Sequence, residues 1–337
     1  MSERFTVKQI AAQAGVSTAT VDRVLNGRSG VHYQTRLRVE RAIAELERRA
    51  AASLAIGWNL YVDVVMHSPV RFTRIVQQAL DQAVAELDPF RISPRFHLFE
   101  DVTPAELARK LEALAADRPG GIILKAPDEP VLAETIAKVS AAGIPVVTLV
   151  TDIPRAPRLA YVGMDNRAAG RTAAFLLGRL LVGKTGTVLA NIGGPHFQGE
   201  EEREIGFRGL MRERFPNLSV AEVSGGYGLD HETRTRVSEC LAEHRDVIAV
   251  YSMGGGNGGI LEAFDRAKRP IHAFIGHDLD AENRRLLEAG RIDAIVDHDL
   301  VADARGALRA ILGFHKRIKG EFHPRPSRAM VITPYNL

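Results

Sequence analysis

Polar and aromatic side chains follow the expected strands of this chain, at the points where the strands end. In open parallel sheets, ligands bind at the carboxyl ends of the strands. Carboxylates, amides and a guanidinium offer paired donors and acceptors to hydroxyl groups, and aromatic rings pack against C–H faces of a ligand ring. We therefore expect a polyhydroxylated ligand to bind at the following residues: His67, Phe72, Lys125, Asp152, Phe197, Gln198, Glu202, Arg203, Ser252, Asp278 and His298.

A glycine-rich loop offers a different chemistry. Residues 254–259 read Gly-Gly-Gly-Asn-Gly-Gly, which satisfies the G-x-G-x-x-G spacing of dinucleotide-binding turns, and Asp278 follows about 20 residues later. A nicotinamide-dependent enzyme that uses the Gly254–Gly259 loop is therefore the alternative function. The loop follows the third expected strand of its lobe and not the first strand of the chain. We therefore expect these glycines to let a helix begin close to the cleft, and we expect no cofactor.

Histidine and aspartate also cluster at residues 277–278 and 297–299. Both residue types bind metals, but the same side chains can form a hydrogen-bonding rim around a ligand, and we expect a rim and no metal. The chain has no Gly-x-Ser-x-Gly turn of the kind that presents a nucleophilic serine. We therefore expect no catalytic residue and no enzyme activity.

A second functional pattern lies near the N-terminus. Ala11, Gly15 and Val21 have the spacing of a helix-turn-helix, in which a small residue, a turn glycine and an aliphatic residue let two helices pack closely. The second helix of such a motif lies in the major groove of DNA, with its first turn toward the base edges. The alternative is an ordinary helical hairpin in an enzyme core. The expected DNA contacts are Thr6, Ser17, Thr18, Ala19, Thr20, Arg23 and Asn26.

The charge of the chain is distributed unevenly. The whole sequence holds 44 basic and 41 acidic residues, a net charge of +3. Residues 1–55 contain nine basic and five acidic residues, whereas the remaining 282 contain 35 basic and 36 acidic residues. A basic segment attached to a neutral body is typical of a small nucleic-acid-binding module on a carrier domain.

The elements that position these residues follow from the hydrophobic pattern. Three helices are expected over 7–14, 17–26 and 34–49, and from residue 60 short β-branched runs alternate with amphipathic helices. This alternation predicts an α/β fold with two doubly wound parallel-sheet lobes after an all-α headpiece. Five strands are expected in each lobe: 60–66, 94–99, 121–124, 145–150 and 159–162, then 187–192, 220–224, 247–252, 272–275 and 294–296.

Composition sets the expected compartment. The single cysteine, Cys240, excludes an intrachain disulfide framework, and we expect it to be a buried thiol. The polar start of the chain is unlike a secretory signal, and the best apolar run, residues 141–150, is too short to span a membrane. We therefore expect a cytoplasmic protein without a membrane partner.

The sequence of residues 6–26, Thr-Val-Lys-Gln-Ile-Ala-Ala-Gln-Ala-Gly-Val-Ser-Thr-Ala-Thr-Val-Asp-Arg-Val-Leu-Asn, resembles the N-terminal signature of the lactose-repressor (LacI) family of bacterial regulators. Segments at 143–149, 161–166, 201–207 and 275–278 are similar to the periplasmic sugar-binding-protein fold that follows the headpiece in this family. The resemblance implies a type I periplasmic-binding-protein-like effector domain that binds a sugar or sugar derivative between its lobes.

The resemblance also implies a hinge helix that inserts a leucine into the minor groove, and Leu54 in the segment 49–55 matches that leucine. The alternative for Leu54 is packing between headpiece and lobe. Residues 45–52 contain no helix breaker, so the third helix can also continue through this segment.

The resulting prediction has three parts: a headpiece over residues 1–47, a hinge helix or linker over 48–58, and an effector-binding domain over 59–337. The N-lobe would comprise about 59–164 and 299–325, and the C-lobe about 165–298 and 326–337. Function would be allosteric transcription regulation. A homodimer, most simply a repressor of carbohydrate-related genes, would bind a near-palindromic double-stranded operator under control of the effector.

Overall fold

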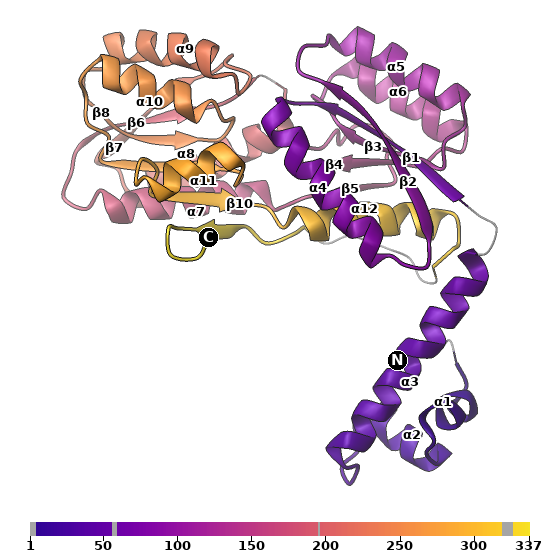
Figure 1. Ribbon diagram of the computed structural model, residues 1–337. Helices are drawn as coiled ribbons and strands as arrows, with labels where there is room; N and C mark the ends of the chain where they lie inside the picture. Colours follow the sequence, from indigo (N-terminus) through magenta and orange to yellow (C-terminus); the bar gives the residue numbers. More distant parts are fainter. Residues whose placement is uncertain (1–4, 56–58, 195, 319–325) are drawn as a thin grey trace.

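The computed structural model describes residues 5–55, 59–194, 196–318 and 326–337, with the side chains of residues 48–55 left out. It has an N-terminal helical headpiece and two α/β lobes that lie side by side (Figure 1). Each lobe has its own sheet, with helices on both faces. This confirms the predicted fold class.

The headpiece consists of α1 (Val7–Ala14), α2 (Thr18–Leu25) and α3 (Tyr33–Ala55). Its small core is formed by Ile10, Ala11, Ala14, Val21, Val39 and Ala42, which are all buried. Gly15 ends α1 with a φ of 61°, a left-handed conformation that glycine adopts without strain. Arg38 of α3 donates from Nη2 to the carbonyl of Ala14 at 2.9 Å and so ties the turn to the third helix.

The third helix continues into the expected hinge segment, which is one of the two outcomes that the sequence allows. It was predicted to end near Arg49, but α3 runs as one helix to Ala55, and the backbone of residues 49–55 forms its last two turns. No proline or glycine interrupts residues 45–55, so nothing in the local sequence stops helix propagation.

The N-lobe contains a parallel sheet in the order β2-β1-β3-β4-β5. Helices α5 and α6 cover one face of this sheet, and α4 and α12 cover the other (Figure 1). Buried β-branched and aliphatic side chains alternate between the two faces, as expected for a sheet covered on both sides. The elements are β1 (Asn59–His67), α4 (Val70–Glu86), β2 (Arg91–Phe99), α5 (Pro104–Ala116), β3 (Gly121–Lys125), α6 (Pro130–Ala141), β4 (Val146–Leu149), β5 (Ala160–Val162) and α12 (Leu300–Phe314).

The C-lobe contains a sheet in the order β11-β10-β9-β8-β6-β7 among the described residues. Helices α7 and α8 pack on one face of the sheet, and α9, α10 and α11 pack on the other. The elements are α7 (Asn166–Leu180), β6 (Gly186–Asn191), α8 (Gln198–Arg214), β7 (Leu218–Val223), α9 (Asp230–Glu243), β8 (Val247–Ser252), α10 (Asn257–Arg266), β9 (Ala273–His277), α11 (Ala281–Glu288), β10 (Ala294–Asp297) and β11 (Met330–Ile332). The sequence predicted only five strands here, because β11 is three residues long and pairs antiparallel with β10.

The chain passes between the lobes at three places in the described structure. It crosses from β5 to α7, from β10 to α12, and again before β11. The first and third crossings lie side by side, because Ser327 donates its N–H to the carbonyl of Gly163 at 2.9 Å and Met164 forms a β-bridge with Ser327. The lobes are therefore joined along one edge, and the cleft between them lies beside these crossings.

Across the described part of the chain, every helix is too short or too polar to span a membrane. Within the same residues, His, Cys, Asp and Glu side chains nowhere gather in threes as a metal site would require.

Candidate functional site

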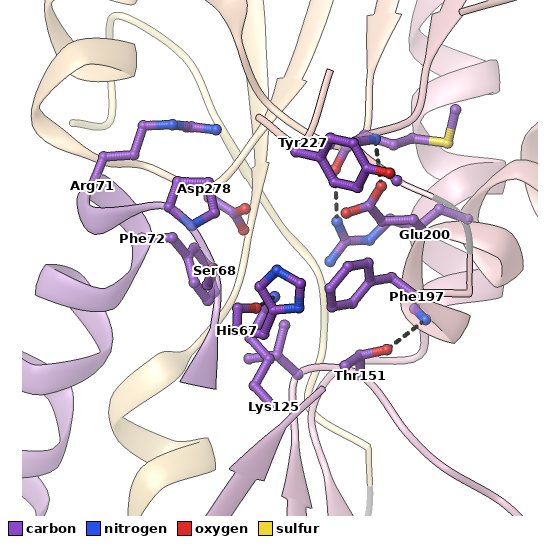
Figure 2. A pocket seen from close by; sticks show the side chains of 18 of the residues that line it. His67, Ser68, Arg71, Phe72, Lys125, Thr151, Phe197, Glu200, Tyr227 and Asp278 are labelled. Carbon is purple, nitrogen blue, oxygen red and sulfur yellow. Dashed lines mark hydrogen bonds between the residues drawn. The ribbon is translucent and has the colours of Figure 1, made fainter. Parts of the chain in front are cut away.

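A cavity of about 690 Å³, counted with its open mouth, lies between the two lobes. The N-lobe contributes the ends of β1, β3 and β4 and the first turn of α4, and the C-lobe contributes the loops after β6, β8 and β9 and the start of α8 (Figure 2). Both lobes supply charged and aromatic side chains. A ligand in this cavity would contact both lobes at once.

Six of the predicted effector-binding residues line the cavity: His67, Phe72, Lys125, Phe197, Arg203 and Asp278. Phe72 and Phe197 come from opposite lobes, and the rings of His67 and Phe197 form a T-shaped contact with centroids 5.7 Å apart. The cavity thus combines flat apolar faces with charged donors and acceptors, an arrangement that suits hydroxyl groups on a ring.

Asp152, Gln198 and Glu202 lie outside this lining, in a separate hollow of the surface beside the first crossing. Asp152 forms a two-point ion pair with Arg158, whose Nη2 lies 2.6 Å from Oδ2. Glu202 forms a similar two-point ion pair with Arg167, whose Nε lies 2.6 Å from Glu202 Oε2. Each carboxylate has a basic partner close in the fold, so neither is directed into the cavity.

Ser252 and His298 also lie outside the cavity lining, because both are buried below it. The Ser252 hydroxyl lies 3.3 Å from the Asn191 amide nitrogen. His298 contacts two residues that do line the cavity, since its Nε2 lies 3.0 Å from Arg203 Nη2 and 3.3 Å from Asp278 Oδ1. His298 is therefore placed to support those residues from beneath.

The sequence interpretation missed several charged or aromatic lining residues: Arg71, Glu100, Glu200 and Tyr227. Glu200 had a usable signal, because it lies three residues before Arg203 on α8 and such residues share a helix face. Arg71 and Tyr227 had none, because their places in the cavity depend on how the two lobes face each other.

Lys125 is the most unusual ionisable group of the cavity. Its ammonium lies 4.6 Å from the centre of the Phe197 ring and 5.5 Å from the centre of the Phe72 ring. The ammonium donates a hydrogen bond to the carbonyl of His67 at 3.3 Å. Burial lowers the pKa of Lys125 to about 8, and the attraction of Glu200 and Asp278 opposes that effect. The two rings stabilise the cation by cation–π attraction.

Glu200 and His67 show the same effect of burial. Burial raises the pKa of the Glu200 carboxyl, although Arg203 and Lys125 favour its charged form. Its Oε2 accepts a hydrogen bond from the Gly193 N–H at 2.6 Å. Burial, together with the nearby Lys125 charge, lowers the pKa of His67. The interior of the cleft is thus poorly solvated, which strengthens polar contacts to a bound ligand.

Arg203 joins the cavity to the crossings between the lobes. Its Nε donates to Asn166 Oδ1 at 2.8 Å, its Nη1 donates to the carbonyl of Met253 at 3.1 Å, and its Nη2 contacts His298. Asn166 begins α7 just after the first crossing, and His298 lies on the second crossing. One buried guanidinium therefore contacts the cavity and two of the segments about which the lobes would move.

The Gly254–Gly259 loop is filled by the protein itself. A Cβ atom on Gly254 would lie 1.9 Å from the Gly193 nitrogen, and one on Gly259 would lie 2.0 Å from the Asp230 carbonyl oxygen. The Asp230 carboxylate accepts from the Gly259 N–H at 3.1 Å, in the first turn of α10 where a pyrophosphate would bind. The glycines permit close packing of the loop, and a dinucleotide has no comparable space there.

The second functional surface is the headpiece. Thr6 and Gln9 form a capping box at the start of α1, and Ser17 accepts from the Thr20 N–H at the start of α2. The residues expected to face DNA lie outward: Thr6, Ser17, Thr18, Ala19, Arg23 and Asn26 are exposed, and Thr20 is half-buried. Leu54 lies in the last turn of α3, and its side chain is outside the described residues.

One polar residue of α2 was not predicted. Asp22 accepts from Asn26 Nδ2 at 2.8 Å and pairs with Arg28 at 3.3 Å. The Asp22 carboxylate therefore holds the side chains of Asn26 and Arg28 in place beside Arg23 on α2.

Comparison with known proteins agrees with both surfaces. Residues 64–313 match the periplasmic binding protein domain family, and residues 6–48 match the bacterial regulatory proteins of the lacI family. The HTH-type transcriptional regulator AglR of Rhizobium meliloti (strain 1021) is 29% identical over 227 residues, which cover 64% of this chain. The alignment spans 60% of that relative, less than two thirds of its length.

Solved structures share the fold of the two lobes. GanP, a glucose-galactose binding protein from Geobacillus stearothermophilus, superposes with a TM-score of 0.71 at 24% identity and covers 83% of this chain and 99% of its own. An ABC transporter solute binding protein from Agrobacterium vitis, bound with alpha-D-tagatopyranose, has a TM-score of 0.71 at 20% identity. The superposition covers 82% of this chain and 96% of that protein.

These matches confirm the family resemblance that the sequence motifs carry. The chain belongs to the periplasmic binding protein domain family and has, ahead of that domain, the helix-turn-helix of the lacI family of bacterial regulatory proteins.

Proposed function

We propose that the protein is a ligand-responsive DNA-binding transcription regulator, and that it represses genes of carbohydrate use. One observation carries the proposal: a single chain joins a helix-turn-helix with an outward polar recognition helix to a two-lobed cavity lined from both lobes. The headpiece would be residues 1–47, the linker 48–58, into which α3 continues as far as Ala55, and the effector domain 59–337. The protein would act in the cytoplasm, where its DNA is.

The proposed effector is a sugar or a sugar derivative. The aromatic faces of Phe72 and Phe197 and the polar atoms of Lys125, Glu200 and Asp278 suit a polyhydroxylated ring. Among proteins of the same fold, one is named for glucose and galactose and another is bound with alpha-D-tagatopyranose, which supports this choice of ligand class.

The proposed active unit is a homodimer on a near-palindromic operator. Two copies of α2 would enter successive major-groove faces, with Thr18, Ala19, Thr20 and Arg23 toward the bases and Thr6, Ser17 and Asn26 toward the backbone. Leu54 would insert at the operator centre. Effector binding would change how the lobes meet and so change operator affinity by about 5–150-fold, a coupling of about 1–3 kcal/mol.

The test uses the purified full chain. A gel shift with DNA from upstream of its own gene, at low ionic strength, should show a preferred fragment. A thermal-shift screen of mono- and disaccharides, sugar acids and glycosides should identify a stabilising compound, and Asp278→Ala should lose the response but keep the gel shift. A chain that prefers no fragment, with or without these compounds, would contradict the proposal.

A further inference from the structure

The cleft is bridged by an arginine that reaches from one lobe into the other. Arg71 lies in the first turn of α4 in the N-lobe, at the wall of the cavity (Figure 2). Its Nη1 lies 2.9 Å from Asp280 Oδ2, and its Nη2 donates to the carbonyl of Gly228 at 3.3 Å. Both partners belong to the C-lobe, where Asp280 begins α11. Arg71 therefore links the two lobes directly.

The C-lobe has a socket whose shape depends on glycine. A Cβ on Gly255 would lie 1.6 Å from Arg71 Nη2, and a Cβ on Gly228 would lie 3.0 Å from the same atom. Gly255 has a φ of 82° and Gly228 a φ of 71°, conformations that favour glycine. The glycine-rich loop that resembles a dinucleotide-binding motif thus receives the Arg71 guanidinium.

Charge and burial favour this contact. Asp280 is 3% exposed and Arg71 24% exposed, so the ion pair is partly shielded from water and is less weakened by solvent than a surface pair. Asp230 and Glu282 lie close by and add negative potential, and the pKa of Glu282 is raised by burial and by Asp230 but lowered by Arg71. The two carboxylate oxygens of Asp280 have different partners. Oδ1 accepts a hydrogen bond from the Asn283 N–H at the start of α11, and Oδ2 binds Arg71.

We propose that Arg71, Asp280 and the glycines at 228 and 255 form an interlobe latch that stabilises the closed arrangement of the lobes. Arg71 is then a positioning residue: it controls how often the cleft opens, and so how readily an effector enters and leaves. This inference rests on the proposed function for its regulatory meaning, but the latch itself is a property of the lobes. A ligand need only shift an equilibrium that the latch has already biased toward the closed state.

Other contacts also cross between the lobes: Phe197 packs against His67 and Lys125, and backbone groups form hydrogen bonds at two further places. The Gly199 N–H donates to Thr151 Oγ1 at 3.0 Å, close to the first crossing, and the Asp128 N–H donates to the carbonyl of His196 at 2.7 Å. Neither contact contains a buried ion pair, and neither depends on a glycine socket. The latch is therefore the interlobe contact that single substitutions can remove most cleanly.

The test measures the distance between the lobes in the full chain, without DNA and without added ligand. Spin labels at Ala113→Cys on α5 and Ser238→Cys on α9, both exposed positions, would report cleft opening by double electron–electron resonance. Cys240, which is buried, is replaced by serine to keep the labelling specific. The labelled parent should show mainly one short distance.

Three variants should weaken the latch in different ways. Arg71→Gln removes the cation, Gly255→Ala places a methyl group where the guanidinium lies, and Asp280→Asn keeps an oxygen that can cap α11 but removes the charge. We expect each variant to add a longer distance, with the open-to-closed ratio raised about tenfold by Arg71→Gln, which corresponds to about 1.4 kcal/mol. The matched control is Arg74→Gln, an exposed arginine on the same helix, which should leave the distances unchanged.

Folding is checked by far-UV circular dichroism and melting temperature, because Gly255→Ala also strains the backbone. Arg71→Gln leaves the socket intact and therefore keeps the test valid if Gly255→Ala fails to fold. An Arg71→Gln variant with the parent distance distribution would overturn the latch, as would a parent that is already mostly open. Absence of DNA binding would overturn the proposed function and leave the latch standing, because DNA takes no part in this measurement.

Discussion

Arg203 Nη2 lies 3.0 Å from His298 Nε2, and this contact links the cleft to the segment that joins β10 to α12. The same Nε2 atom lies 3.3 Å from Asp278 Oδ1, and the second ring nitrogen is Nδ1. That nitrogen faces the buried carboxylate of Asp303 at 3.8 Å. A line of polar side chains therefore runs from the cavity into the first turns of α12.

Replacing Arg203 should damage stability as well as ligand response. Arg203→Met leaves Asn166 Oδ1 and the Met253 carbonyl buried without their donor, and each unpaired group costs about 1–3 kcal/mol. Urea denaturation should therefore show a loss of at least about 2 kcal/mol. The control is Arg212→Met, an exposed residue of the same helix, which should change stability by less than about 0.5 kcal/mol. Equal stabilities would contradict the network.

The packing of α7 against α8 depends on two glycines. A Cβ on Gly170 would lie 1.9 Å from the Arg203 carbonyl oxygen, and a Cβ on Gly206 would lie 2.1 Å from the Arg167 carbonyl oxygen. Gly170→Ala must push the helices apart and should cost about 1–3 kcal/mol in a thermal or urea melt. Gly209→Ala on α8 meets nothing within 4 Å, so it should stabilise the protein by up to about 1 kcal/mol through helix propensity. The prediction is confirmed if Gly170→Ala lowers the free energy of unfolding and Gly209→Ala raises it.

Lys125 should make stability depend on pH in the alkaline range. Burial lowers its pKa to about 8 in the folded protein, whereas the unfolded chain keeps the ordinary value of 10.5. Between these values the unfolded chain binds more protons, so the free energy of unfolding contributed by Lys125 rises with pH, by up to about 3 kcal/mol. Below pH 8 Lys125 is protonated in both the folded and the unfolded protein, so its contribution to the free energy of unfolding does not change with pH. The measurement compares urea melts of the parent and Lys125→Met from pH 7 to 10.

The difference between those two proteins isolates Lys125 from tyrosines and other lysines that titrate in the same range. Lys125→Met should be the more stable protein at pH 7, since it buries no charge, and its advantage should shrink as pH rises. A constant difference over the whole range would mean that the amine is solvated.

Arg23 tests the DNA surface. Its side chain is exposed on α2 beside Ala19 and Asn26, so Arg23→Ala should remove a contact without unfolding the headpiece. If Arg23 reads a base, operator affinity should fall by about 1–3 kcal/mol and base preference should relax at one position of each half-site. Fluorescence anisotropy against a set of single-base operator variants measures both effects. If it contacts a phosphate instead, the loss will be uniform across sequences and the salt dependence will become shallower.

Local patterns were sufficient for most of the fold. The helix expected over residues 7–14 is α1 with the same ends, and Gly15 ends it as predicted, because capping residues and periodic apolar residues act over a few neighbours. Strand β11 was missed because its three residues gain their partner, β10, only through a late return of the chain to the C-lobe.

The site was harder to predict than the fold. The position of a residue after a strand identified His67, Lys125 and Asp278, since strand ends converge in any parallel sheet. The same rule placed Asp152 with them, but a carboxylate turns toward the nearest cation, and Arg158 is only six residues away. Arg71 shows the converse case, because its partner Asp280 is 209 residues away and no local pattern joins them.

The three neighbouring passages of backbone between the lobes limit the kinds of motion available. A single strand of chain would let the halves twist, slide and bend, whereas several tethers along one edge leave mainly one soft direction, the opening angle. Any event in the cleft must then be expressed as a change in that one angle. Because opening is then the main motion of the two lobes, a small displacement in the cleft moves distant parts of the lobes, and little of it is spent on twisting or sliding.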